Sequence, residues 1–209
     1  MSQFERPNIA KMQGYTSGEQ PQDGRSIKLN TNENPYPPSP HVAAALKAFA
    51  SDQLRVYPQP DARALRQAIA DHHEISVDSV VITHAGDEAL RLAVTTFVAP
   101  GGVVASTEPT YSLYPVLAQI QDARMFTLDL DDDWSLPNDF ASKVSTAGAQ
   151  LTCVVNPHAP SGYLNNIPTL QGLAEQLEGV LLGDEAYADF VDVDEPSSMA
   201  SLVSEHENL

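Results

Sequence analysis

The sequence predicts an α/β protein, a three-layer sandwich in which helices cover both faces of a mostly parallel β-sheet. Three observations predict this class. Short apolar runs of strand length, such as Val103–Ser106 and Leu151–Val155, recur along the chain. Amphipathic segments of helix length separate these runs, and turn residues bound them. Strands that are apolar on both faces are typical of a parallel sheet that is covered on both sides.

The first 35 or so residues are polar and irregular, and a proline-rich stretch follows at residues 34–40. Proline fixes φ and lacks an N–H group, so this stretch is neither helix nor central strand. Ser39 as N-cap and Pro40 as first helical residue predict a helix that reaches Ala50. A second break at Tyr57–Asp61 leads into a helix with an apolar face. That face consists of Leu65, Ala68, Ile69 and His72.

From residue 80 onward, apolar runs and helical spacings alternate in chain order. The apolar runs predict strands at Val80–Thr83, Val103–Ser106, Met125–Leu128, Leu151–Val155 and Val180–Gly183. The helical spacings predict a helix that carries Leu90, Ala93, Val94 and Phe97, and further helices at Tyr111–Gln121, Leu136–Ser145 and Leu170–Leu177.

The composition of the chain argues against nucleic acid and membranes as binding partners. The chain has 209 residues, with 28 acidic and 11 basic side chains and a formal net charge of −17. Such an acidic field repels nucleic acid and anionic membranes. Apolar runs are far shorter than the ~20 residues that a membrane span needs, and the N-terminus has no signal-peptide pattern. The single cysteine, Cys153, excludes an intramolecular disulfide and indicates a cytoplasmic protein. We assign no metal site.

Polar residues follow the predicted strands at the edge where α/β sheets bind ligands. The turn Ala85–Glu88 opens a helix, so its backbone N–H groups suit an anion. It is neither a dinucleotide fingerprint nor a Walker loop, and taken alone it favours a plain strand-to-helix turn with Asp87 as a cap. Tyr111 follows the next strand, where its ring could stack on a flat ligand or pack under a loop.

Two later strands end in further groups of this kind. The prolines and glycine of residues 156–162 impose a turn that fixes the direction of the Asn156 amide. Asp184 ends an apolar run, where a buried carboxylate needs a partner such as a protonated ring nitrogen, or else caps a helix. Tyr187 can donate a hydrogen bond to a phenolate-like oxygen. Together these groups meet the needs of pyridoxal phosphate, whose protonated ring absorbs carbanion electrons.

In chain order, the motifs resemble the N-terminal part of histidinol-phosphate aminotransferases, within the fold-type I aminotransferases. Six motifs in register carry the resemblance, from about Lys28 onward. They are residues 29–36 (Leu-Asn-Thr-Asn-Glu-Asn-Pro-Tyr), Tyr57-Pro58 with Asp61, Gly86–Ala89, Pro109–Tyr111, Asn156-Pro157 with Pro160 and Gly162, and Asp184–Tyr187. The resemblance implies a large domain that binds pyridoxal 5′-phosphate.

The resemblance implies cofactor-binding roles for residues at three strand ends. Gly86, Asp87 and Glu88 would hold the cofactor phosphate through the helix N-terminus. Tyr111 would stack on the pyridine ring, and Asp184 would pair with the ring nitrogen.

Further roles are implied for residues at the other motifs. Asn156 and Tyr187 would bond the cofactor's 3′-oxygen. Tyr57 would reach the phosphate of the neighbouring subunit in a homodimer of the complete protein. Asn34 and Tyr36 would lie near the substrate.

Two departures from the family pattern stand out. Where the family usually has Asn-Pro-Asn-Asn-Pro-Thr-Gly, this chain has His158 and Ala159 at the third and fourth positions. We expect His158 to be a solvated loop residue, like His84. The second departure is a missing lysine. Family members bond the cofactor through a lysine that follows the Asp184 motif, yet no lysine or arginine follows Asp184 here. We therefore assign no catalytic residue and expect this chain alone to be inactive.

The missing lysine suggests a chain that ends before the catalytic residue. Residues 1–50 would be the N-terminal arm and the start of the small domain. Residues 51–209 would be an incomplete large domain. By resemblance, strands from later sequence would separate Val80–Thr83 from the other four strands, which can pair among themselves.

The expected function is an aminotransferase acting on histidinol phosphate and 2-oxoglutarate in histidine biosynthesis. Its partners would be a small-molecule amino donor and a 2-oxo acid. Alternatives within the subfamily are a threonine-phosphate decarboxylase and an aromatic aminotransferase. Alternatives from other classes are a lysine-free binding protein that kept the half-site and an unrelated nucleotide-binding domain.

Overall fold

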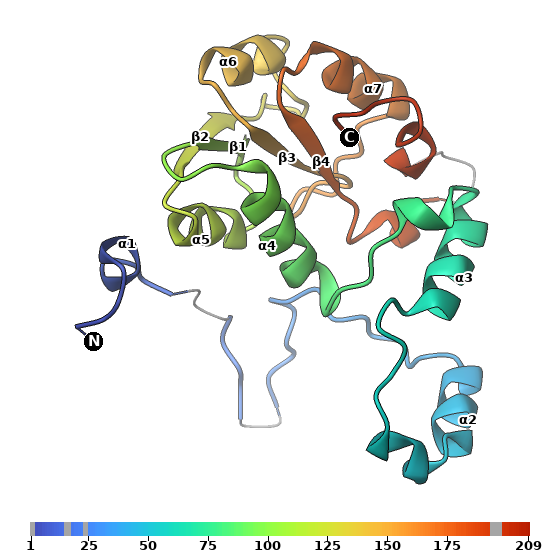
Figure 1. Cartoon of the computed structure of the whole chain (residues 1–209). Helices are drawn as coiled ribbons and strands as arrows, with labels where there is room; N and C mark the ends of the chain where they lie inside the picture. The colour runs from blue at the N-terminus through green and yellow to red at the C-terminus, as the bar shows by residue number, and fades with distance from the viewer. Residues whose placement is uncertain (1–2, 15–17, 23–24, 193–197) are drawn as a thin grey trace.

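The computed structural model describes residues 3–14, 18–22, 25–192 and 198–209. Its four-stranded sheet has the order β2-β1-β3-β4, and all neighbouring strands are parallel (Figure 1). The strands are β1 (Val103–Glu108), β2 (Arg124–Asp129), β3 (Leu151–Val155) and β4 (Val180–Asp184). Four of the five predicted strands, and their pairing with one another, are thereby confirmed.

Helices cover both faces of this sheet, as predicted. Helices α4 (Ala85–Phe97) and α5 (Leu113–Ile120) pack on one face, and α6 (Phe140–Thr146) and α7 (Ile167–Gln176) pack on the other. Val104 lies in the core under α4 and α5, while its neighbours Val103 and Ala105 lie in the core under α6 and α7. This division follows from the alternation of side chains along a strand. The molecule therefore has two apolar cores that share one sheet.

The first predicted helix begins where Ser39 and Pro40 predict it. The Ser39 hydroxyl accepts a hydrogen bond from the backbone N–H of His41 at 3.3 Å and caps α2 (Pro40–Ala48). The next long helix is α3 (Arg63–His73). Short helical turns complete the described part of the chain, namely α1 (Pro7–Ala10), η1 (Ser51–Arg55), η2 (Val77–Ser79), η3 (Ala188–Phe190) and η4 (Met199–Leu202).

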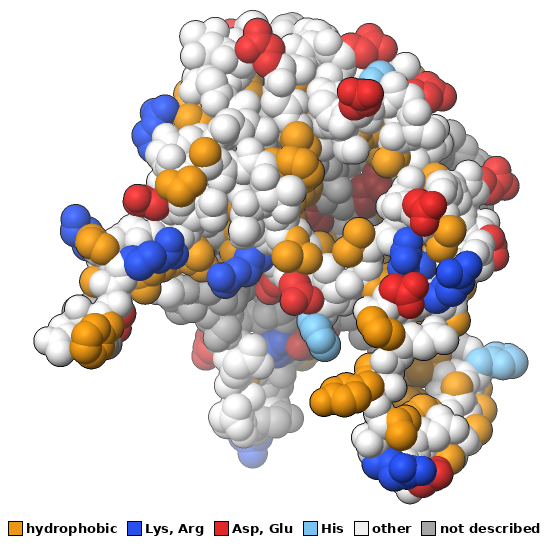
Figure 2. Space-filling view, in the orientation of Figure 1, with side chains coloured by type: hydrophobic (Ala, Val, Ile, Leu, Met, Phe, Trp, Pro, Cys, Tyr) orange, Lys and Arg blue, Asp and Glu red, His pale blue; other side chains and the backbone are white. Residues whose placement is uncertain are grey.

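The segment with α2 and η1 stands away from the sheet (Figure 1). Every residue of α2 is exposed, although the helix carries apolar side chains. Figure 2 shows such side chains gathered over this segment at the lower right. We call this surface the α2–η1 patch; its large exposed apolar residues are Val42, Leu46, Phe49, Leu54, Val56 and Tyr57.

One predicted strand is wrong, and two helices, α5 and α6, begin later than predicted. Val80 has extended backbone angles, φ −111° and ψ 127°, but Val80–Thr83 pairs with no strand in the described part of the chain. An extended segment becomes a strand only where a neighbour bonds its N–H and C=O groups. The helix predicted from Leu136 begins at Phe140, after a turn in which the Pro137 carbonyl accepts the Phe140 N–H.

Helix α7 begins earlier than predicted, at Ile167 rather than Leu170. The Asn166 side chain caps this helix by accepting a hydrogen bond from the Thr169 N–H at 2.9 Å. Across the residues that the structure describes, we find no helix with the length and apolarity required to cross a bilayer.

Candidate active site

Two of the predicted site residues meet where β3 and β4 end. Val155 is in register with Asp184, and the backbone N–H of the next residue, Asn156, donates to the Asp184 carbonyl at 2.9 Å. Parallel strands bring their carboxyl ends to one edge of a sheet, which explains why residues 28 positions apart in sequence are neighbours. This edge is the centre of the candidate site.

The Asp184 carboxylate has a buried phenol as its partner. The Tyr114 hydroxyl donates to Asp184 Oδ2 at 2.7 Å, and the Tyr114 side chain is only 1% exposed. Burial, and then the nearby Asp184 charge, raise the pKa of the Tyr114 phenol far above its usual value of 10. The phenol therefore keeps its proton and acts as the donor in this bond.

A second tyrosine continues the chain of contacts to the start of α4. The rings of Tyr111 and Tyr114 meet edge to face, with centroids 5.8 Å apart and planes at 89°. The Tyr111 hydroxyl donates to Asp87 Oδ1 at 3.2 Å. The structure thus brings Asp87, Tyr111 and Asp184 together on the face of the sheet that α4 and α5 cover.

The first turn of α4 leaves room for a ligand. Apart from its two chain neighbours and the backbone of its own helix, no described atom lies within 4 Å of the point where a side chain at Gly86 would begin. Ala85 just before it has φ 62°, in the left-handed region. Glu88 Oε2 accepts the N–H of the exposed residue His84 at 2.5 Å, so this carboxylate caps its own helix. The N–H groups of a helix's first turn have no partner inside the helix.

The Asn156 amide is held inside its own loop. Its Oδ1 accepts the Asn165 N–H at 2.8 Å, and its Nδ2 donates to the Asn165 carbonyl at 3.2 Å. The side chain is fully buried. An amide nitrogen carries two hydrogens, and the Asn165 carbonyl takes one of them.

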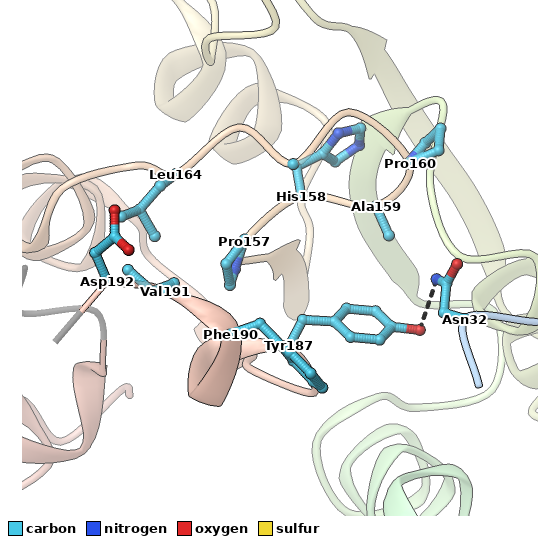
Figure 3. Close-up of a pocket in the computed structure, with 11 residues that line it drawn as sticks. Asn32, Pro157, His158, Ala159, Pro160, Leu164, Tyr187, Phe190, Val191 and Asp192 are labelled. Atoms are coloured by element: carbon cyan, nitrogen blue, oxygen red, sulfur yellow. Dashed lines mark hydrogen bonds between the residues drawn. The ribbon is translucent and has the colours of Figure 1, made fainter. Parts of the chain in front are cut away.

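Tyr187 lines a pocket of about 450 Å³ beside this loop (Figure 3). Asn32 lies across the pocket, and its Nδ2 donates to the Tyr187 hydroxyl at 3.0 Å. The other walls come from the loop residues Pro157, His158, Ala159, Pro160, Gly162 and Leu164 and from Phe190, Val191 and Asp192. Asp87, Tyr111 and Asp184 are not among the residues that line this pocket.

The expectation that His158 is solvated is wrong. It is 4% exposed; its Nε2 lies 3.0 Å from the Pro109 carbonyl and its Nδ1 lies 2.8 Å from Ser161 Oγ. A carbonyl only accepts, so Nε2 carries the hydrogen. Burial costs little here because both ring nitrogens have partners. The ring ties the turn after β3 to the segment after β1, which leads to Tyr111.

Three predicted site residues lie at the surface of the N-terminal segment. Tyr57 is fully exposed, and Tyr36 is 79% exposed. The Asn34 side chain accepts the Tyr36 N–H at 2.9 Å in a local turn. From this segment Asn32, which sequence reasoning did not single out, makes the contact with Tyr187.

Sequence reasoning also missed Tyr114. One signal was available, because Tyr114 lies on the apolar face of a predicted helix, three positions after Tyr111. A buried tyrosine hydroxyl needs a hydrogen-bond partner. Nothing in the local pattern identified Asp184 as that partner.

A family model and curated relatives that match this chain are described as aminotransferases. A family model described as "Aminotransferase class I and II" matches residues 25–209. The histidinol-phosphate aminotransferase of Clostridium botulinum (strain Kyoto / Type A2) is 40% identical over 205 residues, covering 97% of this chain and 55% of that protein. That of Geotalea uraniireducens (strain Rf4) is 39% identical over 205 residues, covering 98% and 57%. The chain spans about half the length of these relatives.

Solved structures share the fold. The histidinol-phosphate aminotransferase from Sinorhizobium meliloti, in complex with pyridoxal-5′-phosphate, matches with a TM-score of 0.84 at 24% identity, covering 96% of this chain and 56% of that one. The L-threonine-O-3-phosphate decarboxylase from Porphyromonas gingivalis matches with a TM-score of 0.67 at 18% identity, covering 81% and 50%.

Proposed function

Because its residues 25–209 match the family model, the chain belongs to the class I and II aminotransferase family, and we propose that it forms the cofactor-binding part of a histidinol-phosphate aminotransferase. The observation that carries this proposal is the 40% identity, over 97% of the chain, to a relative of that name. The whole protein would exchange an amino group between histidinol phosphate and 2-oxoglutarate.

The proposed cofactor is pyridoxal 5′-phosphate, and the groups at the candidate site suit it. Bound cofactor supplies a protonated ring that absorbs the electrons left at the substrate's α-carbon. The Asp184 carboxylate would accept the hydrogen of the ring nitrogen, and the Tyr111 ring would lie against the pyridine. Asn156 and Tyr187 would donate to the ring oxygen.

The phosphate would bind through backbone donors at the start of α4. Acidic side chains repel phosphate, yet both carboxylates of this turn already accept hydrogens. Asp87 accepts from the Tyr111 hydroxyl, and Glu88 accepts from the His84 N–H. The open space at Gly86 and the helix dipole then favour an anion beside the N–H groups of Gly86 and Asp87.

We further propose that the whole protein is a homodimer. The α2–η1 patch exposes several large apolar side chains, and contiguous apolar surface of this kind marks an interface. In such a dimer the fully exposed Tyr57 would reach the neighbouring subunit's cofactor phosphate. Light scattering should give twice the subunit mass, and Leu46→Glu with Leu54→Glu should shift the whole protein to monomer. A monomeric wild type would contradict the proposal.

Assay of the whole protein tests the reaction. We expect transamination of histidinol phosphate with 2-oxoglutarate, at a higher kcat/KM than with tyrosine. Release of carbon dioxide from threonine phosphate would instead indicate the decarboxylase. Sequencing beyond the codon of Leu209 tests whether the reading frame continues into a Ser-Lys segment, since a frame without such a lysine would favour the binding protein.

A further inference from the structure

The partner of Asp184 suggests how this carboxylate is kept in position. Asp184 is the last residue of β4, and it is only partly buried. A carboxylate in that position can turn toward water, in which case it must be reoriented before it meets a ligand. Reorientation at the moment of binding lowers affinity.

The Tyr114 hydroxyl removes that freedom. It donates to Asp184 Oδ2 at 2.7 Å, whereas Oδ1 is bonded only at 3.3 Å by the Ala186 N–H. The Tyr114 ring is itself immobilised, because it lies in the core between α4, α5 and the sheet and meets Tyr111 edge to face. A rigid donor therefore holds one oxygen of a partly exposed carboxylate.

We propose that Tyr114 is a positioning residue that holds Asp184 in the orientation needed to accept the hydrogen of a protonated ring nitrogen. This inference rests on the proposed cofactor and adds a residue that touches no part of it. The Tyr114 hydroxyl acts only through Asp184, so its effect should appear only with ligands that have a ring nitrogen.

The test uses two ligands that bind without a lysine. One is pyridoxamine 5′-phosphate, and the other is its 1-deaza analogue, in which a C–H group replaces the ring nitrogen. Calorimetric titration of the 209-residue chain at neutral pH gives both affinities. We expect the wild type to prefer pyridoxamine 5′-phosphate, and Asp184→Asn to abolish that preference.

Tyr114→Phe should reduce the preference roughly tenfold, which is typical for the loss of one hydrogen bond to a charged group. Tyr163→Phe is the matched control, because its hydroxyl makes no hydrogen bond within the described part of the chain, and it should leave the preference unchanged. 4-Aminophenylalanine at position 114 retains a donor at the ring's end and should restore the preference.

The outcomes separate the two proposals. A Tyr114→Phe variant whose preference is unchanged would overturn the positioning proposal. If its affinity for both ligands also falls equally, Tyr114 only supports the fold. A wild type without any preference would overturn the pairing of Asp184 with a ring nitrogen, and with it the proposed function. If Tyr114→Phe does not fold, the preference can be compared between chains that carry 4-fluorophenylalanine, which has no donor, and 4-aminophenylalanine, which has one, at position 114.

Discussion

Asn156 and Asn165 exchange two hydrogen bonds between the side chain of one and the backbone of the other, at 2.8 and 3.2 Å. The pair closes the loop after β3, and the Asn156 side chain is fully buried. The carbonyl of Asp184, the last residue of the neighbouring strand β4, accepts the Asn156 N–H as well. The loop that borders the candidate site is therefore built around one amide.

Asn156→Ala should lower the free energy of unfolding by about 2 kcal/mol, because it leaves the Asn165 N–H and carbonyl buried without partners. Urea unfolding followed by circular dichroism measures the change. Asn138→Ala, at an exposed turn position, is the control and should change stability by less than ~0.5 kcal/mol. Equal effects at the two positions would contradict this account of the loop.

His158→Ala should destabilise the chain by about 2 kcal/mol, since it leaves the Pro109 carbonyl and the Ser161 hydroxyl without their partner. It should also change the emission of Trp134, the chain's single tryptophan, whose ring lies 5.9 Å from the imidazole. Ser161→Ala removes the bond to Nδ1 and the hydrogen bond that Ser161 Oγ accepts from the Tyr163 N–H at 3.1 Å. It leaves the imidazole and its bond to the Pro109 carbonyl in place, so it should change the Trp134 emission less than His158→Ala does. Wild-type fluorescence and stability in both variants would refute the bridging role.

Glu185 should make stability depend on pH. Its carboxylate accepts hydrogen bonds from the Ser198 hydroxyl and the Met199 N–H, but burial is the larger influence and raises the pKa of Glu185 above 4.5. The folded chain therefore retains this proton to a higher pH than the unfolded chain. Stability from this group is present below 4.5 and is lost as the pH rises through the folded pKa.

Glu185→Gln should accordingly lose less stability than the wild type as the pH rises from about 4.5. Urea unfolding at a series of pH values measures this difference. Glu178→Gln removes the same charge from an exposed site, so it corrects for the general repulsion within a chain of net charge −17. Parallel pH profiles for the two variants would contradict the prediction.

Borohydride treatment of the 209-residue chain with pyridoxal phosphate should not label a single lysine selectively. Lys28 pairs with Glu33, Lys143 pairs with Asp139, and Lys143 lies on α6, across the sheet from Tyr111. Peptide mass mapping locates any label. Stoichiometric labelling of one lysine, abolished by changing that lysine to alanine, would show that this chain carries a bonding lysine after all.

Much of the sheet was predictable because its strands are local signals. Strands β1 and β3 are short runs that are buried on both sides, so composition marks them. Strand β4 lies at the edge of the sheet and only Leu181 in it is buried, but its run Val180–Leu182 is also apolar. Val80–Thr83 is also rich in β-branched residues, but it has no partner strand among the residues that the structure describes. Its example shows that an apolar run predicts the tendency to extend, whereas a strand also requires a neighbour.

The candidate site divides in the same way. The sequence by itself determined which groups follow the strands: the turn at Gly86, the ring of Tyr111, the amide of Asn156 and the carboxylate of Asp184. Only the tertiary structure decided which side chains those groups meet. Tyr114 lies 70 positions from Asp184, and the Asn32 contact with Tyr187 spans 155 positions.

The physical reason is the range of the interactions. Hydrophobic periodicity, prolines and capping residues act over a few neighbouring residues, so they can be recognised in the sequence. A hydrogen bond between distant residues depends on how strands pair and how helices pack across them. Tyr114 and His158 therefore look like ordinary helix and loop residues in the sequence, and their partners become visible only when the sheet brings its carboxyl ends together.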